Sequence, residues 1–363
     1  MHAVYIHIPF CRSICSYCDF CKVYYNKKFT TNYLKMLEKE IISQYNNELI
    51  STIYIGGGTP SSLDTLELKE LFRITKLFKK TRNYEFSFEC NIEDISLELL
   101  QILKENGVNR LSFGIESFNK KILKLMNRKA SYKDCLNKIN LARMLGFDNI
   151  NVDLIYALPG ESIFTLKQDI HKIIKLNPEH ISTYSLILEK NTILYNKGYK
   201  NIKEEKDAKM YNYIIKTLKR HGYNHYEVSN FAKAKAGLES RHNITYWLNE
   251  EYYGFGCGAS GYIGNIRYEN TRSITSYLKG NFCLNKNLLS KQEEMDNEIM
   301  LGLRLLKGIN LDHFYEKYHV SLMDAYYNVK NLIKEGLLTL EDNYLKIPEE
   351  YIYIMDSIVI KII

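Results

Sequence analysis

The sequence predicts an α/β fold built on a parallel sheet with helical crossovers. Apolar, β-branched runs alternate with longer amphipathic stretches through the first two thirds of the chain, and turn signals such as Asn106-Gly107 and Asn177-Pro178 precede several of the runs. Six strand-then-helix repeats are typical of a parallel sheet. At 363 residues, two domains, or one large domain with an appendage, are expected. Periodicity leaves two architectures open, a doubly wound sheet and an incomplete α/β barrel.

Strands and helices are expected in regular alternation from the N-terminus. The strand-like runs occupy residues 4–8, 52–56, 84–89, 110–115, 150–155 and 181–187. The helix-like stretches between them occupy residues 31–49, 64–79, 95–106, 118–127, 132–145 and 162–175. Together they predict a first domain over residues 1–225.

The pattern changes after residue 225. Residues 226–290 mix short Gly-rich and Tyr-rich segments and are expected to connect two domains. An amphipathic helix is expected next, then two shorter helices and a hairpin-like segment, at residues 291–306, 310–318, 321–335 and 337–354. Three helices followed by a hairpin predict a small, mostly helical, winged-helix-like C-terminal domain over residues 291–363.

Composition and charge narrow the function classes. The net charge of the chain is +7. The 49 Lys and Arg residues are spread along the sequence, which favours a solvated surface over a nucleic-acid interface. No run approaches 18 apolar residues, which argues against a transmembrane segment but leaves peripheral membrane contact open. No secretory signal is visible at the N-terminus. We therefore expect a cytoplasmic protein in a reducing compartment, where structural disulfides are rare.

Four of the eight cysteines crowd together directly after the first expected strand. Cys11, Cys15 and Cys18 have the spacing C-x3-C-x2-C, and three thiolates on one loop can hold three irons of a cubane cluster. The fourth iron would then be open to a small molecule. A zinc site fits this spacing poorly, because zinc sites prefer C-x2-C pairs. Cys21 is interpreted as a spare ligand, a redox partner or a small buried residue.

The cysteine motif, with Tyr17 before its third Cys, resembles that of the radical S-adenosylmethionine (SAM) superfamily. The resemblance implies an incomplete parallel (β/α)6 barrel with a 4Fe–4S cluster whose open iron binds SAM. It also implies that an electron from the reduced cluster cleaves SAM to methionine and a 5′-deoxyadenosyl radical, so an electron donor is an expected partner.

Further motifs resemble one branch of this superfamily. They are Gly56-Gly57-Gly58-Thr59-Pro60, Asn109-Arg110-Leu111-Ser112-Phe113-Gly114 and Asp153-Leu154-Ile155-Tyr156-Ala157-Leu158-Pro159-Gly160. The branch contains oxygen-independent coproporphyrinogen III dehydrogenases and radical SAM haem chaperones. The match covers about residues 4–345.

The resemblance also assigns individual residues to SAM. Tyr5, Gly57 and Glu89 match positions that contact the cluster-bound SAM. Positions around a second SAM in the dehydrogenase are matched by Tyr17, Gly58, Thr59, Glu116, Arg128, Asp153 and Ser185. Glu116 stands where the branch usually has Gln, so an amide that donates and accepts is replaced by a carboxylate that only accepts. For each polar residue, the alternative is a satisfied side chain at a strand end.

A motif in the expected connecting segment suggests a haem site. His242-Asn243-Ile244-Thr245-Tyr246-Trp247 resembles a block found in the chaperones. Histidine is a common axial ligand of haem iron, so His242 is a candidate haem ligand. The alternatives are that the motif lines the substrate cavity, or that His242 is structural and Trp247 packs between the domains.

Three features favour the chaperone over the dehydrogenase. They are the motif at residues 242–247, Cys18-Asp19-Phe20 in place of Cys-x-Cys, and an expected lack of the dehydrogenase's N-terminal arm, since Cys11 lies so near the start. Ser260 departs from the chaperone pattern, which usually has His there. We therefore expect a haem chaperone that binds haem or porphyrin as cargo and passes haem to a recipient haemoprotein. The alternatives are a coproporphyrinogen III dehydrogenase, which converts two propionates to vinyls, and a haem-modifying radical SAM enzyme.

Overall fold

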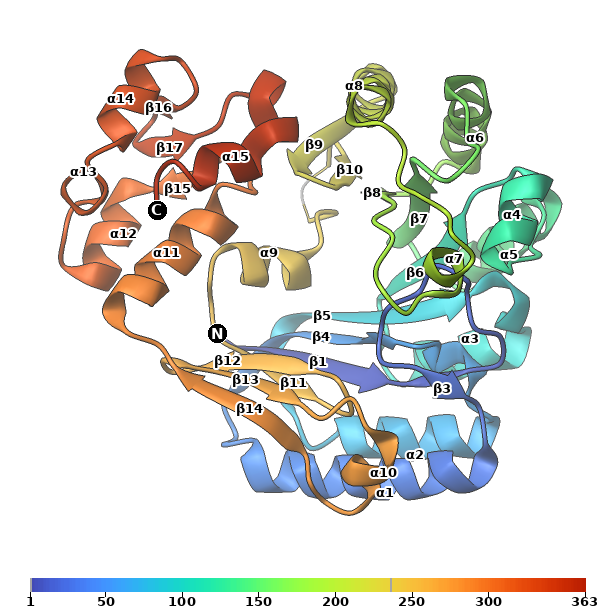
Figure 1. Cartoon of the computed structure of the whole chain (residues 1–363). Helices are drawn as coiled ribbons and strands as arrows, with labels where there is room; N and C mark the ends of the chain where they lie inside the picture. Colours follow the sequence, from blue (N-terminus) through green and yellow to red (C-terminus); the bar gives the residue numbers. More distant parts are fainter. Residues whose placement is uncertain (1, 236) are drawn as a thin grey trace.

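The computed structural model describes residues 2–235 and 237–363 (Figure 1). Met1 and Ala236, which fall within the predicted segments 1–225 and 226–290, lie outside the described residues. Among the described residues, no helix is both long enough and apolar enough to cross a membrane.

Six parallel strands form the centre of the molecule. They are β1 (His2–Ile8), β4 (Leu49–Gly57), β5 (Lys79–Asn91), β6 (Arg110–Glu116), β7 (Ile150–Tyr156) and β8 (His180–Ser185). Each pairs in parallel with the next one in this order. The predicted parallel sheet with six strand-and-helix repeats is therefore confirmed.

The sheet continues beyond both ends of this set. β11 (Tyr252–Phe255) pairs in parallel with β1, and β10 (Asn230–Lys233) pairs antiparallel with β8. The outer strands are β9 (Tyr223–Glu227) on one side and β12 (Ser260–Ile263), β13 (Ile266–Asn270) and β14 (Cys283–Leu288) on the other. Because β1 and β8 pair with these additional strands instead of with each other, the barrel stays open. The predicted boundary after residue 225 falls inside β9, and the segment 226–290 contributes strands to the same sheet.

Helices connect the parallel strands and cover their outer face, as α1 and α2 do below β1 and β4 in Figure 1. The connecting helices are α1 (Lys27–Gln44), α2 (Thr65–Thr75), α3 (Leu97–Glu105), α4 (Lys120–Met126), α5 (Tyr132–Met144) and α6 (Ile163–Leu176). Later helices are α7 (Ile193–Asn196), α8 (Glu204–Arg220), α9 (Arg241–Trp247) and α10 (Ile274–Leu278). Short elements near the first strands are β2 (Phe10–Cys11), β3 (Val23–Tyr24) and two 3₁₀ turns, Pro60–Ser62 and Ile92–Asp94.

The C-terminal region is helix-rich and carries a small antiparallel sheet, as predicted for a winged-helix-like unit. Its helices are α11 (Lys291–Gly302), α12 (Leu311–Tyr318), α13 (Leu322–Ala325), α14 (Val329–Lys334) and α15 (Met355–Val359). Its strands are β15 (Ile309–Asn310), β16 (Thr339–Glu341) and β17 (Tyr344–Lys346), and a 3₁₀ helix spans Glu349–Ile354. The predicted helix at 321–335 is two helices, because Tyr326 is buried with a non-helical backbone (φ −128°, ψ 87°). The predicted hairpin ends at Lys346.

The predicted helices 31–49, 64–79 and 291–306 all extend past the ends of the observed helices, the last because α11 ends at Gly302. α1 ends at Gln44 because Leu49 already belongs to β4, and α2 ends at Thr75 because Lys79 begins β5. Leu49 and Lys79 are register partners in the sheet. Strand pairing therefore overrides the helical pattern at both ends, a long-range effect that local periodicity does not contain.

A buried carboxyl group on α1 joins three parts of the fold. Glu40 accepts hydrogen bonds from the backbone N–H of Gly256 (2.9 Å), the Asn270 side-chain amide and the Tyr277 hydroxyl. Burial raises the pKa of Glu40 from 4.5 to about 7. The folded state therefore binds this proton more tightly than the unfolded state does.

The free energy of unfolding should fall by about 3 kcal/mol, through this group, as pH rises from 4.5 to above 7. Glu40→Gln should remove this part of the pH dependence, because an amide does not titrate. Urea unfolding at pH 5 and pH 8 measures the effect, with the exposed Glu105→Gln as the matched control. A Glu40→Gln variant that keeps the wild-type pH profile contradicts the assignment.

Candidate functional site: a cysteine and carboxylate pocket

A pocket of about 430 Å³ opens where the parallel strands end. Parallel strands finish at the same edge, so side chains from several strand ends gather there. The three predicted cluster cysteines and nine of the ten predicted SAM residues line it: Cys11, Cys15, Cys18, Tyr17, Gly57, Gly58, Thr59, Glu89, Glu116, Arg128, Asp153 and Ser185. Tyr5 is the predicted SAM residue outside the lining.

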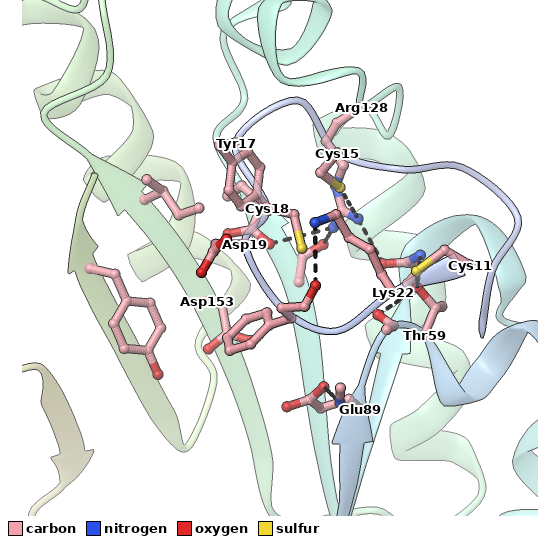
Figure 2. A pocket seen from close by; sticks show the side chains of 18 of the residues that line it. Cys11, Cys15, Tyr17, Cys18, Asp19, Lys22, Thr59, Glu89, Arg128 and Asp153 are labelled. Atoms are coloured by element: carbon pink, nitrogen blue, oxygen red, sulfur yellow. Dashed lines mark hydrogen bonds and ion pairs between the residues drawn. The ribbon is translucent and has the colours of Figure 1, made fainter. Parts of the chain in front are cut away.

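The cysteines lie on the loop between β1 and α1, and Figure 2 shows their side chains on one side of the pocket. The Thr59 hydroxyl lies 3.4 Å from Cys11 Sγ, and Arg128 Nη1 lies 3.8 Å from Cys15 Sγ. Within residues 2–235 and 237–363, no three His, Cys, Asp or Glu side chains converge as ligands of one metal ion. Separated thiols around a shared cavity suit a multi-iron cluster, whose irons stand apart.

The turn after β4 brings backbone close to the cysteine loop. Gly57 has a left-handed backbone (φ +114°), and a Cβ there would lie 2.6 Å from the His7 ring. At Gly58, a Cβ would lie 2.7 Å from the Pro9 backbone. Glycine is therefore required for this close approach. His7 also holds Tyr5 beneath the pocket, because the Tyr5 hydroxyl is hydrogen-bonded to His7 Nδ1 (2.9 Å).

Two half-buried carboxyl groups at the pocket have polar neighbours within the sheet. Glu89 accepts from the Tyr54 hydroxyl (2.8 Å) and from the Gly57 N–H (3.0 Å). Asp153 accepts from the Ser112 hydroxyl (3.0 Å) and the Asn151 amide (2.9 Å). Burial raises the pKa of Asp153, and raises that of Glu89 to about 7. Both groups would therefore be stabilised in their ionised form by a cationic ligand.

The third carboxyl group, Glu116, lies opposite the guanidinium of Arg128 (Oε1 to Nη2, 3.7 Å). Its backbone is left-handed (φ 69°), which is unusual for a residue other than glycine. Burial raises the pKa of Glu116 to about 7, although Arg128 opposes the rise. A protonated carboxyl group donates one hydrogen bond and accepts another, as the usual Gln of this position would. Ser185 is less free to meet a ligand, because its hydroxyl donates to Asp207 (2.6 Å).

His242 lies outside this pocket. Its side chain is 1% exposed, Nδ1 is hydrogen-bonded to the Thr52 hydroxyl (2.8 Å) and Nε2 to the Tyr246 hydroxyl (2.7 Å). Burial lowers the pKa of His242 to about 3, so the ring stays neutral. Binding of a haem iron would require one of these two hydrogen bonds to break.

Sequence reasoning missed Tyr54, which connects His242 to the pocket. The Tyr54 ring stacks on the His242 ring (centroids 5.1 Å apart), and its hydroxyl reaches Glu89. The available signal was the two-residue period of β4, which puts Thr52, Tyr54 and Gly56 on one face. On β1, Tyr5 and His7 are likewise two residues apart and therefore lie on the same face of the strand.

Cys21 faces away from the pocket lining. Its Sγ lies 3.6 Å from Cys257 Sγ, and the two thiols can also donate to the carbonyls of Arg272 (3.4 Å) and Thr271 (3.0 Å), respectively. The side chain is thus buried between the end of the cysteine loop and the turn after β11. Ser260, the other departure from the expected pattern, is exposed on β12.

Comparisons with known proteins agree with this architecture. The family described as "Radical SAM superfamily" matches residues 5–173, and "HemN C-terminal domain" matches residues 289–350. Coproporphyrinogen III oxidase (HemN) from Escherichia coli superposes with a TM-score of 0.87 over 99% of this chain and 89% of that chain. At 21% identity, this shows the shared fold. Fold and family together define a protein of the radical SAM class.

More similar relatives narrow the family. The chain is 41% identical to "Heme chaperone HemW" of Bacillus subtilis, over 93% of both chains. It is 40% identical to "Heme chaperone HemW" of Lactococcus lactis, over 93% of this chain and 90% of the relative. The chain belongs to the HemW family of heme chaperones within the radical SAM superfamily.

Replacing Cys21 with Ser should leave the visible absorption of a reconstituted iron–sulfur cluster unchanged, because its thiol points toward Cys257. Cys15→Ser should abolish that absorption, because Cys15 lines the pocket and a serine hydroxyl is a poor substitute for an iron-bound thiolate. Anaerobic reconstitution followed by absorption spectroscopy checks both variants. Loss of the cluster in the Cys21 variant alone would place the ligand set elsewhere on the loop.

Proposed function

We propose that this protein is a haem chaperone that holds a 4Fe–4S cluster and SAM and passes haem to recipient haemoproteins in the cytosol. Haem is the cargo in this proposal and is not modified. The observation that carries the proposal is the pocket itself, which is lined by three cysteines of one loop and by three carboxyl groups. Its relatives named heme chaperones support haem as the cargo.

Cys11, Cys15 and Cys18 would hold the cluster. Their thiols line one cavity, and Gly57 and Gly58 let the end of β4 pack closely against His7 and Pro9 beside them. When bound, such a cluster supplies single electrons to a ligand on its open iron. Thr59 orients Cys11 through its hydroxyl, and Arg128 lowers the electrostatic cost of a thiolate at Cys15.

The carboxyl groups favour SAM as the second ligand. Glu116 is buried, Glu89 and Asp153 are half-buried, all three line the pocket, and Arg128 faces Glu116. A carboxylate removed from water needs a positive partner or several donors. SAM carries a sulfonium and an ammonium group, so it would satisfy this requirement. Tyr17 would face the same ligand from the cysteine loop, while Tyr5 would support the floor through His7.

We infer that His242 positions the pocket floor and does not bind haem iron in this conformation. Both of its ring nitrogens are hydrogen-bonded, and its ring face is covered by Tyr54. Tyr54 in turn holds Glu89. His242 would therefore act on SAM binding through two intervening side chains.

The proposed function is tested by an anaerobic assay on protein with a reconstituted cluster. Haem titration should give a saturable absorption change, and coproporphyrinogen III with SAM and dithionite should yield no protoporphyrinogen. Cys15→Ala is the control that removes the cluster while leaving the rest of the pocket. Formation of protoporphyrinogen would overturn the chaperone proposal in favour of a dehydrogenase.

His242→Ala should weaken SAM binding by about tenfold or less, because Tyr54 loses one stacking partner. His242→Gln should restore part of this loss, since a glutamine amide can still bond to Thr52 or Tyr246. Haem affinity should change little in either variant. Equilibrium dialysis with SAM and absorption titration with haem measure the two affinities separately. If haem binding is lost while SAM binding is retained, His242 is the haem ligand instead.

A further inference from the structure

A basic groove lies on the outer side of the cysteine site, between α4, the start of α5 and α6. Its volume is about 650 Å³. We call it the lysine groove and define it by its six charged lining residues, Lys120, Lys124, Arg128, Lys129, Lys133 and Lys172. All six are cations, whereas the whole chain has 49 basic and 42 acidic residues. This concentration of one sign distinguishes the groove from the mixed surface elsewhere.

The lysines of the groove keep their charge exposed. Lys120, Lys124, Lys129 and Lys133 are solvent-exposed. Lys172 is half-buried, with its ammonium above the Phe118 ring (5.5 Å from the centroid).

Two carboxylates near the groove accept hydrogen bonds from neighbouring residues. Asp134 accepts from Ser131 at the start of α5, and Glu93 accepts from the Lys129 backbone N–H. The five lysines outnumber these two carboxylates, so the groove presents net positive charge to solvent.

The groove shares a wall with the cysteine pocket. Arg128 lines both cavities, and its Nη1 lies 3.8 Å from Cys15 Sγ. The neighbouring Asn127 donates to Ser13 Oγ (3.0 Å) and to the Ile14 carbonyl (2.9 Å) of the cysteine loop. One layer of side chains thus separates the basic surface from the proposed cluster site. Arg128 is labelled beside Cys15 in Figure 2.

We propose that the lysine groove docks an acidic one-electron carrier protein. This inference rests on the proposed function, because it assumes that the cysteine site holds an iron–sulfur cluster. The reduced carrier loses one electron and the cluster gains one, with no bond formed and no proton transferred. Complementary charge would orient the carrier and raise its association rate, and the shared wall keeps the transfer distance short. A nucleic acid or anionic membrane would use the same lysines but would gain nothing from the contact with Arg128.

The test compares two triple variants of the full-length protein with a reconstituted cluster. One variant reverses the charge at three positions of the groove, with the substitutions Lys124→Glu, Lys129→Glu and Lys133→Glu. Lys209→Glu, Lys216→Glu and Lys330→Glu are the matched control, because they make the same change in net charge at exposed positions on α8 and α14. The probe is an acidic flavodoxin in its hydroquinone form. Cluster reduction is followed by absorption, and flavodoxin affinity is measured separately by calorimetry.

The groove variant should bind flavodoxin at least about tenfold more weakly than wild type at low salt, and its cluster should be reduced correspondingly more slowly. Wild type should lose this advantage as salt rises, because the interaction is screened. The control variant should stay within about threefold of wild type. Dithionite, which needs no docking surface, should reduce the cluster of all three proteins at equal rates.

Equal flavodoxin affinity and rates in the groove variant and wild type would overturn the proposal. An equal loss in both triple variants would also overturn it, because net charge and not the groove would then be responsible. Binding of RNA or of anionic vesicles that depends on the groove, with flavodoxin reduction unaffected, would assign the surface to that partner instead. Failure of dithionite to reduce the wild-type protein would count against the cluster, and hence against the proposed function rather than the groove alone.

Discussion

The gathering of three carboxyl groups in one pocket at the edge of the sheet is the constraint on which the site depends. Removing a carboxylate from water costs free energy unless hydrogen bonds or a cation compensate it. The fold supplies part of this compensation from neighbouring strands, through Tyr54 and Gly57 for Glu89 and through Ser112 for Asp153. The raised pKa values show that the compensation is incomplete. A ligand that brings positive charge would complete it.

Much of the site could be predicted because parallel strands force their ends together. Once the strands were located from their apolar runs, Gly57, Glu89 and Asp153 had to meet at one edge, wherever they lay in the sequence. The cysteine loop follows the first strand directly, so it reaches the same edge. The family resemblance selected these residues, and the strand pattern explains why they meet.

The position of α9 could not be predicted in the same way. Glu85 on β5 accepts hydrogen bonds from the backbone N–H groups of Arg241 and His242, which are more than 150 residues away in the sequence. These bonds bury His242 against β4 and explain why it does not reach the pocket. The sheet extension that begins with β11 likewise depends on pairing with a distant segment, the N-terminal strand β1. Periodicity reports whether a residue faces a core, but not which distant segment will cover it.

The contacts of α9 show how the motif at residues 242–247 connects the pocket to the C-terminal region. At one end, His242 lies beneath Tyr54 and hence beneath Glu89. At the other end, Trp247 lies under the guanidinium of Arg304, just after α11 (4.5 Å to the ring centroid). The helix therefore spans the space between the pocket floor and the C-terminal region through packed side chains. A shift of the C-terminal region can therefore reach the carboxyl groups through this helix, because interiors this closely packed transmit such strain instead of absorbing it.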